Sequence, residues 1–233
     1  MYVEIISYLC ISKFKIRLAM KYIIKHSCNT KEVGYVSWGQ AELTDPYNAN
    51  ELLDEDKTVK TISVRMHKRA KLTDVLSCFK LGIDNNFIIS KQIRAILEDF
   101  KIQPHLFIDC NVEKTNGEII KYNILHLEGS PFPDIVDFKK SIFRMAYTIS
   151  FPLKGDEPIL EINDYSEFIQ KEEELKNKLA LTRLDKYVVN EDYNNKLDMY
   201  TLSPFHSGIF ISKELRDAIL DNKLTGIEII EID

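Results

Sequence analysis

Histidine and cysteine side chains that could serve as a base and a nucleophile lie close together in the middle of the chain. His105 and His126 fall on opposite arms of a predicted hairpin, and Asp109 and Cys110 are on the first arm. A thiol beside a histidine can be activated for nucleophilic catalysis. Ordinary strand pairing accounts for the same positions without any chemistry. A small hydrolase that uses His105, Cys110 and His126 is therefore a hypothesis, and it requires these side chains to meet.

Other chemical signatures are weak. His26 and Cys28 are spaced to provide two metal ligands, but no third or fourth ligand is visible nearby, and a surface histidine beside a buried thiol is the alternative. The chain has no G-x-G-x-x-G, P-loop, H-E-x-x-H or G-x-S-x-G motif, and no C-x-x-C pair. We therefore expect no catalytic residue, no metal and no cofactor, and a protein that acts by binding.

Composition and charge describe an ordinary globular protein. The chain has 233 residues, of which 45% are hydrophobic and 29% charged, and its formal net charge is −5. A net negative charge does not favour nucleic acid or an anionic membrane, so we expect neither as a partner. The basic segment 65–72 lacks the interleaved aromatic residues of a nucleic-acid surface. Four scattered cysteines favour a reducing cytoplasm.

The N-terminal 24 residues are apolar enough to suggest a signal or a membrane span. Glu4, Lys13, Lys15, Arg17 and Lys21 interrupt the segment, and no small-residue cleavage site follows. One interpretation is that the domain begins at Met20 and that residues 1–19 are an extension. The alternative is an amphipathic N-terminal strand or helix.

Apolar periodicity predicts strands at 21–25, 57–66, 141–149 and 158–162, a hairpin turning at Asn116-Gly117, and a last strand from Ile227. Helices are predicted at 90–100 and at 165–181, the latter capped by Asp164, whereas 72–79 is ambiguous and could form a helical turn. The expected fold is α+β, with a mainly antiparallel sheet and two or three flanking amphipathic helices. We expect an extension at 1–19, an α+β lobe with a variable loop at 20–84, and a C-terminal α+β region at 85–233; two related lobes are an option.

One joint between a strand and a helix occurs twice. The string Ile-Ser-Lys-x-x-Arg begins at Ile89 and again at Ile211, and Ser90 and Ser212 are suited to cap the helices that follow. Two interpretations stay open, since such a joint is common but could also record an internal duplication.

The repeated joint and the segment between its copies resemble bacterial polymorphic-toxin immunity proteins, specifically immunity family eleven or its relative, family forty-three. The resemblance covers about residues 87–230 and is strongest over the last 25 or so. Its matching residues are Ser90, Ile93, Tyr122, Leu125, Asp137, Ser141, Phe143, Phe210, Ser212, Leu215, Leu224, Thr225 and Gly226.

That resemblance implies a cytoplasmic protein that binds a cognate toxin domain and blocks it by stoichiometric occlusion. The variable N-terminal region then supplies candidate contacts, although Trp38 could instead pack in the core. These contacts are the aromatic and acidic residues Tyr35, Trp38, Tyr47, Asp54, Glu55 and Asp56. The rivals are the small hydrolase and a non-catalytic adaptor or regulator.

Overall fold

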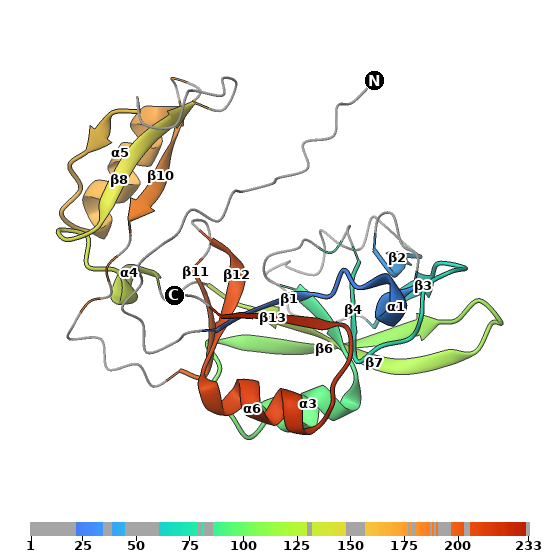
Figure 1. Cartoon of the computed structure of the whole chain (residues 1–233). Coiled ribbons are helices and arrows are strands. Elements are labelled where there is room, and N and C mark those ends of the chain that lie inside the picture. The colour runs from blue at the N-terminus through green and yellow to red at the C-terminus, as the bar shows by residue number, and fades with distance from the viewer. Residues whose placement is uncertain are drawn as a thin grey trace. The chain divides into compact units, whose positions relative to one another are not determined.

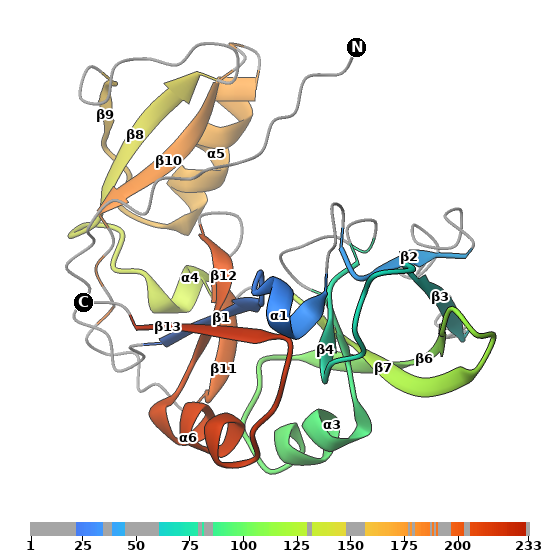
Figure 2. The same ribbon diagram turned by 45° about the vertical axis from the view of Figure 1, so that its right-hand side comes forward.

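The computed structural model describes most of the chain (Figures 1 and 2). The described residues are 22–34, 39–44, 61–78, 81, 86–129, 132–147, 157–176, 178, 180–186, 188, 190, 197–202 and 206–231. Helices and largely antiparallel sheets are combined in it, so the predicted α+β class is confirmed.

Contacts divide the described chain into two compact units. The smaller unit lies within residues 136–191, and the larger unit lies within 19–135 and 192–231. The division expected near residue 84 does not coincide with these units. Strands from both sides of that position share one sheet, because Val75 pairs with Ile89 and Leu76 pairs with Ile88.

The larger unit contains two sheets. Its strands are β1 (Tyr22–His26), β2 (Ala41–Leu43), β3 (Ile62–Met66), β4 (Val75–Leu76), β5 (Asn86–Ile89), β6 (His105–Glu113), β7 (Ile119–Leu127), β11 (Met199–Leu202), β12 (His206–Ile211) and β13 (Ile227–Glu231). Its helices are α1 (Thr30–Val33), α3 (Lys91–Leu97), α4 (Phe132–Ile135) and α6 (Lys213–Asp221). One sheet has the order β2-β3-β6-β7-β5-β4 and the other has the order β11-β12-β1-β13.

The two joints belong to two copies of one arrangement. The first copy is β4, β5, α3, β6 and β7, and the second is β11, β12, α6, β13 and β1. Their strand orders, β4-β5-β7-β6 and β11-β12-β1-β13, are equivalent. Residues in line across the first sheet are Leu76, Ile88, Ile124 and Ile108, and those across the second are Tyr200, Phe210, Ile23 and Ile230.

One offset relates the copies through the helix and into the next strand. Ser212 follows Ser90 by 122 residues, and the same offset separates Ile230 from Ile108. One strand differs in its position along the chain. In the first copy β7 comes last, after β6, whereas in the second copy the equivalent strand β1 comes before all the other elements. Helix capping alone does not require equal register over three pairings, so the structure favours duplication over convergence.

Both copies contribute equivalent residues to one core. Val75 and Met199, Phe87 and Ile209, Ile89 and Ile211, Ile93 and Leu215, and Leu97 and Ile219 are all buried there as matching pairs. The two helices lie side by side beneath the sheets in both ribbon views (Figures 1 and 2). Each helix therefore covers its own strands and packs against the other copy as well.

A pair of aspartates joins the copies reciprocally. The carbonyl of Asp74 accepts from the N–H of Ser90 in its own copy (2.7 Å), and its carboxylate accepts from the N–H of Thr225 in the other copy (2.9 Å). In the same way, Asp198 accepts from Ser212 N–H (2.9 Å) and from Lys101 N–H (3.0 Å). Each aspartate thus holds the start of one copy to the end of the other copy's helix.

The smaller unit is a three-stranded sheet covered on one face by a helix. Its strands are β8 (Ile142–Tyr147), β9 (Ile159–Leu160) and β10 (Ala180–Lys186), in the order β10-β8-β9, and its helix is α5 (Tyr165–Lys176). Phe143 of the sheet and Phe168 of the helix meet with ring centroids 6.1 Å apart, and Phe138 stacks on Phe143 at 5.7 Å. This aromatic cluster forms the core of the unit.

Several local predictions are confirmed, the end of one predicted helix is wrong, and the structure of one ambiguous segment is now defined. Both serines cap their helices, accepting from Ile93 N–H and Leu215 N–H. Segment 72–79 holds strand β4 rather than a helical turn, and the helix predicted over 165–181 ends at Lys176. Strands β10 and β11 were not predicted, because charged residues interrupt the apolar alternation of β10, and the four residues of β11 are too few to show a period.

Candidate protein-binding surface

The six partner-binding residues predicted from the sequence lie outside the described part of the chain. They are Tyr35, Trp38, Tyr47, Asp54, Glu55 and Asp56. Their assignment stays a prediction.

The hypothetical hydrolase residues do not meet. Cys110 pairs with Tyr122, whereas His126 pairs with Leu106 four residues further along. Four residues of strand span about 13 Å, which is far beyond hydrogen-bond reach. His105 is an odd number of residues from Cys110, so its side chain projects from the opposite face of the same strand.

Local contacts explain these side chains structurally. Cys110 is fully buried, and burial raises the pKa of its thiol to about 12. A thiol with such a pKa is not a nucleophile at neutral pH. His105 Nδ1 lies 2.9 Å from the Gln103 carbonyl, and His126 Nδ1 lies 2.8 Å from Asn86 Oδ1.

His26 and Cys28 also do not converge. The His26 ring stacks on Phe87 with centroids 4.5 Å apart, and burial lowers its pKa to about 4. The thiol of Cys28 is exposed and donates to the His26 carbonyl at 4.0 Å. Among the residues described, no group of three or more His, Cys, Asp and Glu is placed to hold a metal ion.

A cluster of paired charged side chains lies on the sheet of the smaller unit. Strand β10 alternates, with Ala180 and Thr182 buried under α5 and Leu181 exposed on the other face. Arg183 projects to the same side as Leu181. On that side Arg183 is directly opposite Arg144 of β8, and Arg144 is directly opposite Ile159 of β9. One row of side chains thus crosses all three strands.

Two carboxylates neutralise the adjacent guanidinium groups. Arg183 Nη1 donates to Glu157 Oε1 at 2.7 Å, and its Nη2 contacts Glu157 Oε2, so the pair is bidentate. Arg144 Nε donates to Asp185 Oδ2 at 3.0 Å, and Arg144 Nη1 donates to the Glu157 carbonyl at 2.7 Å. Like charges directly opposite each other on a sheet are unfavourable, so these partners are needed to hold both arginines in place.

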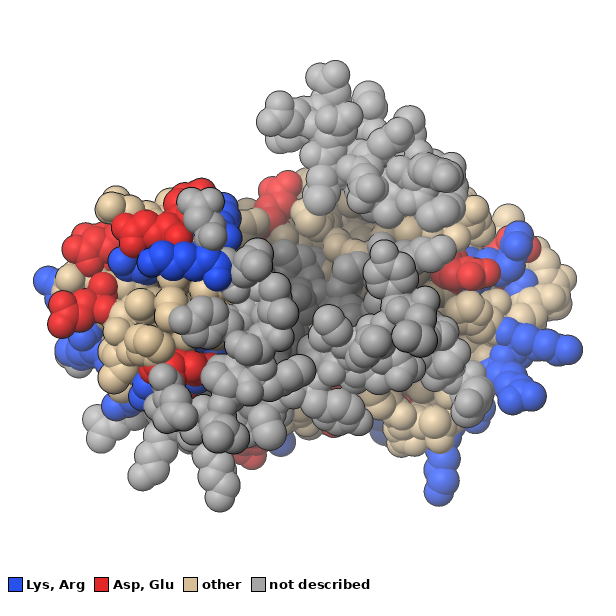
Figure 3. Space-filling view, turned by 90° about the horizontal axis from the view of Figure 1, so that it is seen from above, with Lys and Arg blue, Asp and Glu red and all other residues tan. Residues whose placement is uncertain are grey.

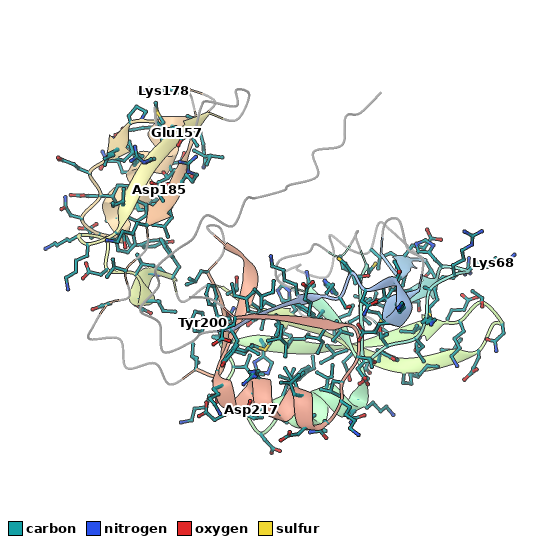
Figure 4. The ribbon with its side chains drawn as sticks, in the orientation of Figure 1. Lys68, Glu157, Lys178, Asp185, Tyr200 and Asp217 are labelled. Carbon is teal, nitrogen blue, oxygen red and sulfur yellow. The ribbon has the colours of Figure 1, made fainter. Side chains whose placement is uncertain are left out.

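Burial shows how firmly the cluster is held. The Glu157 side chain is 3% exposed, and that of Arg183 is 32% exposed. A buried carboxylate is tolerated only when its partner stays in position. Ile159 and Leu181 border the cluster and are 62% and 41% exposed. We call the surface made by Arg144, Glu157, Ile159, Leu181, Arg183 and Asp185 the arginine face; Figure 4 labels Glu157 and Asp185 on this unit.

Sequence reasoning missed the arginine face. The alternation of Leu181, Arg183 and Asp185 was a usable signal of a strand with one polar face, but the helix predicted to reach residue 181 masked it. Arg144 and Arg183 are 39 positions apart in the sequence, and only strand pairing brings them together.

Two further findings concern membranes and known proteins. In the described part of the chain, no helix combines the length and the apolar character that crossing a bilayer requires. The chain matches no protein-family model, and no curated protein matches it.

Proposed function

We propose that this chain is an immunity protein, which binds a cognate bacterial toxin domain and neutralises it by covering the toxin's active site without turnover. The observation that carries the proposal is the sequence resemblance over residues 87–230. We expect it to act in the cytoplasm of the cell that makes the toxin.

The residues behind the resemblance occupy scaffold positions in the structure. Ser90 and Ser212 are helix caps, and Phe210 and Leu215 are buried. Thr225 is bound by Asp74. A resemblance carried by such residues supports a shared fold, and the contacts to a particular toxin would then lie elsewhere on the surface.

The arginine face supports a role in protein binding. Arginine is enriched at protein interfaces and among the contacts that dominate their binding energy. Ion pairs already hold Arg144 and Arg183 before any partner arrives. A surface ordered in advance loses less conformational entropy on binding.

Co-expression with a toxin domain tests the proposal. The chain is expressed with the C-terminal domain of the toxin encoded beside it, and an inactive toxin variant is used for co-purification. We expect growth to be restored and a stoichiometric complex to be isolated. The absence of both rescue and co-purification would contradict the proposal. Co-purification without rescue would favour an adaptor.

A further inference from the structure

We propose that the arginine face is the surface on which the cognate toxin domain docks, and that the toxin presents a carboxylate to Arg144 and Arg183. This inference rests on the function proposed above and adds the site and the chemistry of contact.

Hydrogen-bond capacity on this face is unequal between donors and acceptors. Glu157 directs both carboxylate oxygens at Arg183, and Asp185 directs one oxygen at Arg183 and the other at Arg144. Each guanidinium carries five N–H donors. Within the described chain, Arg144 Nη2 and Arg183 Nε make no hydrogen bond. The protein's acceptors are therefore engaged while donors remain.

Acceptors must therefore come from the partner. A carboxylate fits best, because charge-assisted bonds between guanidinium and carboxylate are about twice as strong as neutral ones. A cationic side chain would find no unengaged carboxylate oxygen on Glu157 or Asp185, and it would meet two arginines. An Asp or Glu of the toxin is the complementary group.

Apolar side chains complete the surface. Ile159 is directly opposite Arg144, and Leu181 is directly opposite Ala146 on the same face. When a partner covers Ile159 and Leu181, water is excluded from the charged row, and the central ion pairs strengthen. The toxin surface is therefore expected to place apolar side chains around its carboxylate.

Other charged surfaces of the described chain are organised differently. On the helices, Arg94 pairs with Glu98 and Lys213 pairs with Asp217 one turn away, and these side chains are largely exposed. Such pairs are common on solvated helices and contribute little. Figure 3 shows acidic and basic side chains interleaved on the smaller unit. Among the residues that the structure describes, only the arginine face combines a buried carboxylate, paired arginines and exposed aliphatic residues.

Ile159 gives a direct test because a substitution there can place either a negative or a positive charge beside Arg144. The full-length chain is titrated with inactive toxin domain by calorimetry, using Ile159→Glu and Ile159→Lys. In Ile159→Glu the new carboxylate of the chain itself accepts from the free N–H donors of Arg144. The toxin carboxylate then loses these donors, so we expect binding to weaken about tenfold or more. In Ile159→Lys no carboxylate is added and the Arg144 donors stay available to the toxin, so we expect a loss of about threefold or less.

Ile119 supplies the matched control. It is 61% exposed against 62% for Ile159, and it lies on β7 of the larger unit. Ile119→Glu and Ile119→Lys should both bind as the wild type does, and thermal unfolding verifies that all four variants fold. Equal binding by Ile159→Glu and Ile119→Glu would overturn the docking site. Equal damage from Glu and Lys at position 159 would overturn the carboxylate. If the wild type does not bind, the proposed function fails first.

Discussion

Asp74 binds Thr225 across 151 residues of sequence, since its Oδ2 accepts hydrogen bonds from both the backbone N–H (2.9 Å) and the hydroxyl (2.8 Å) of Thr225. Its other carboxylate oxygen accepts from the Ser90 hydroxyl at 2.9 Å. One side chain therefore links the cap of α3 to the turn that follows α6. The two copies depend on each other at this point.

Removing that carboxylate should destabilise the larger unit. Asp74→Ala leaves the Thr225 N–H and hydroxyl and the Ser90 hydroxyl without their acceptor, so we expect a loss of about 3 kcal/mol in the free energy of unfolding. Urea unfolding measures it. Asp99→Ala is the control, because Asp99 is exposed and should change stability little. Equal urea midpoints for the two variants would show that Asp74 is not a structural link.

Gly226 should tolerate no side chain. Its φ is +82°, and an added Cβ would lie 2.1 Å from the Val75 carbonyl oxygen. Gly117 has a similar φ of +83° but open space around it. We expect Gly117→Ala to cost about 1–2 kcal/mol, the price of a left-handed alanine. Gly226→Ala should cost at least about 2 kcal/mol more, since backbone must move. Similar thermal stability of the two variants would contradict the close approach.

Acid should weaken the larger unit through His26. Its pKa is lowered from 6.5 to about 4 by burial, so the unfolded chain binds a proton that the folded chain does not between these values. Stability from this group is fully present above about pH 6.5 and falls by about 1.4 kcal/mol per pH unit towards pH 4.

A single substitution isolates that effect. His26 occupies the position that Leu127 holds in the first copy, by the equivalence of β1 and β7. His26→Leu should therefore be accommodated in the core and should have a smaller dependence of stability on pH. Urea unfolding of both proteins at several pH values between 4 and 7.5 measures this. Parallel curves would show that another group causes the acid sensitivity.

Cysteine alkylation should separate exposed from buried thiols. Cys28 is exposed, whereas Cys78 and Cys110 are buried, and burial raises the pKa of Cys110 to about 12. With iodoacetamide at pH 8, peptide mapping should find Cys28 modified well before Cys78 and Cys110, and urea should abolish the difference. Rapid modification of Cys110 in the native protein would revive the hydrolase hypothesis.

Local signals explain what could be predicted from the sequence. Ser90 and Ser212 cap helices through contacts three residues away, and Asn116-Gly117 turns the β6–β7 hairpin with Gly117 at positive φ. The N–H of Gly117 donates to the Lys114 carbonyl at 2.9 Å, which closes the turn. Each of these features is decided within a few residues, so the pattern alone is enough.

Pairing over long distances explains what could not be predicted. Val75-Leu76 is too short to show a period, and it becomes a strand only beside β5. The arginine face likewise forms only when β8 lies beside β10, and no spacing in the sequence reports that Arg144 will face Arg183. The predicted contact residues, by contrast, lie where the structure gives no description.

The position of β1 has a consequence for the order of folding. This strand is synthesised before every other described strand, yet both of its neighbours, β12 and β13, come from the last described segment of the chain. The first copy can assemble from contiguous chain as it is made, whereas the second sheet must wait for translation to bring in its partners. Closing so long a loop is slow. Tyr22–His26 therefore has no strand partner until β12 and β13 have been synthesised. During this interval the unpaired apolar strand makes the protein most prone to aggregation.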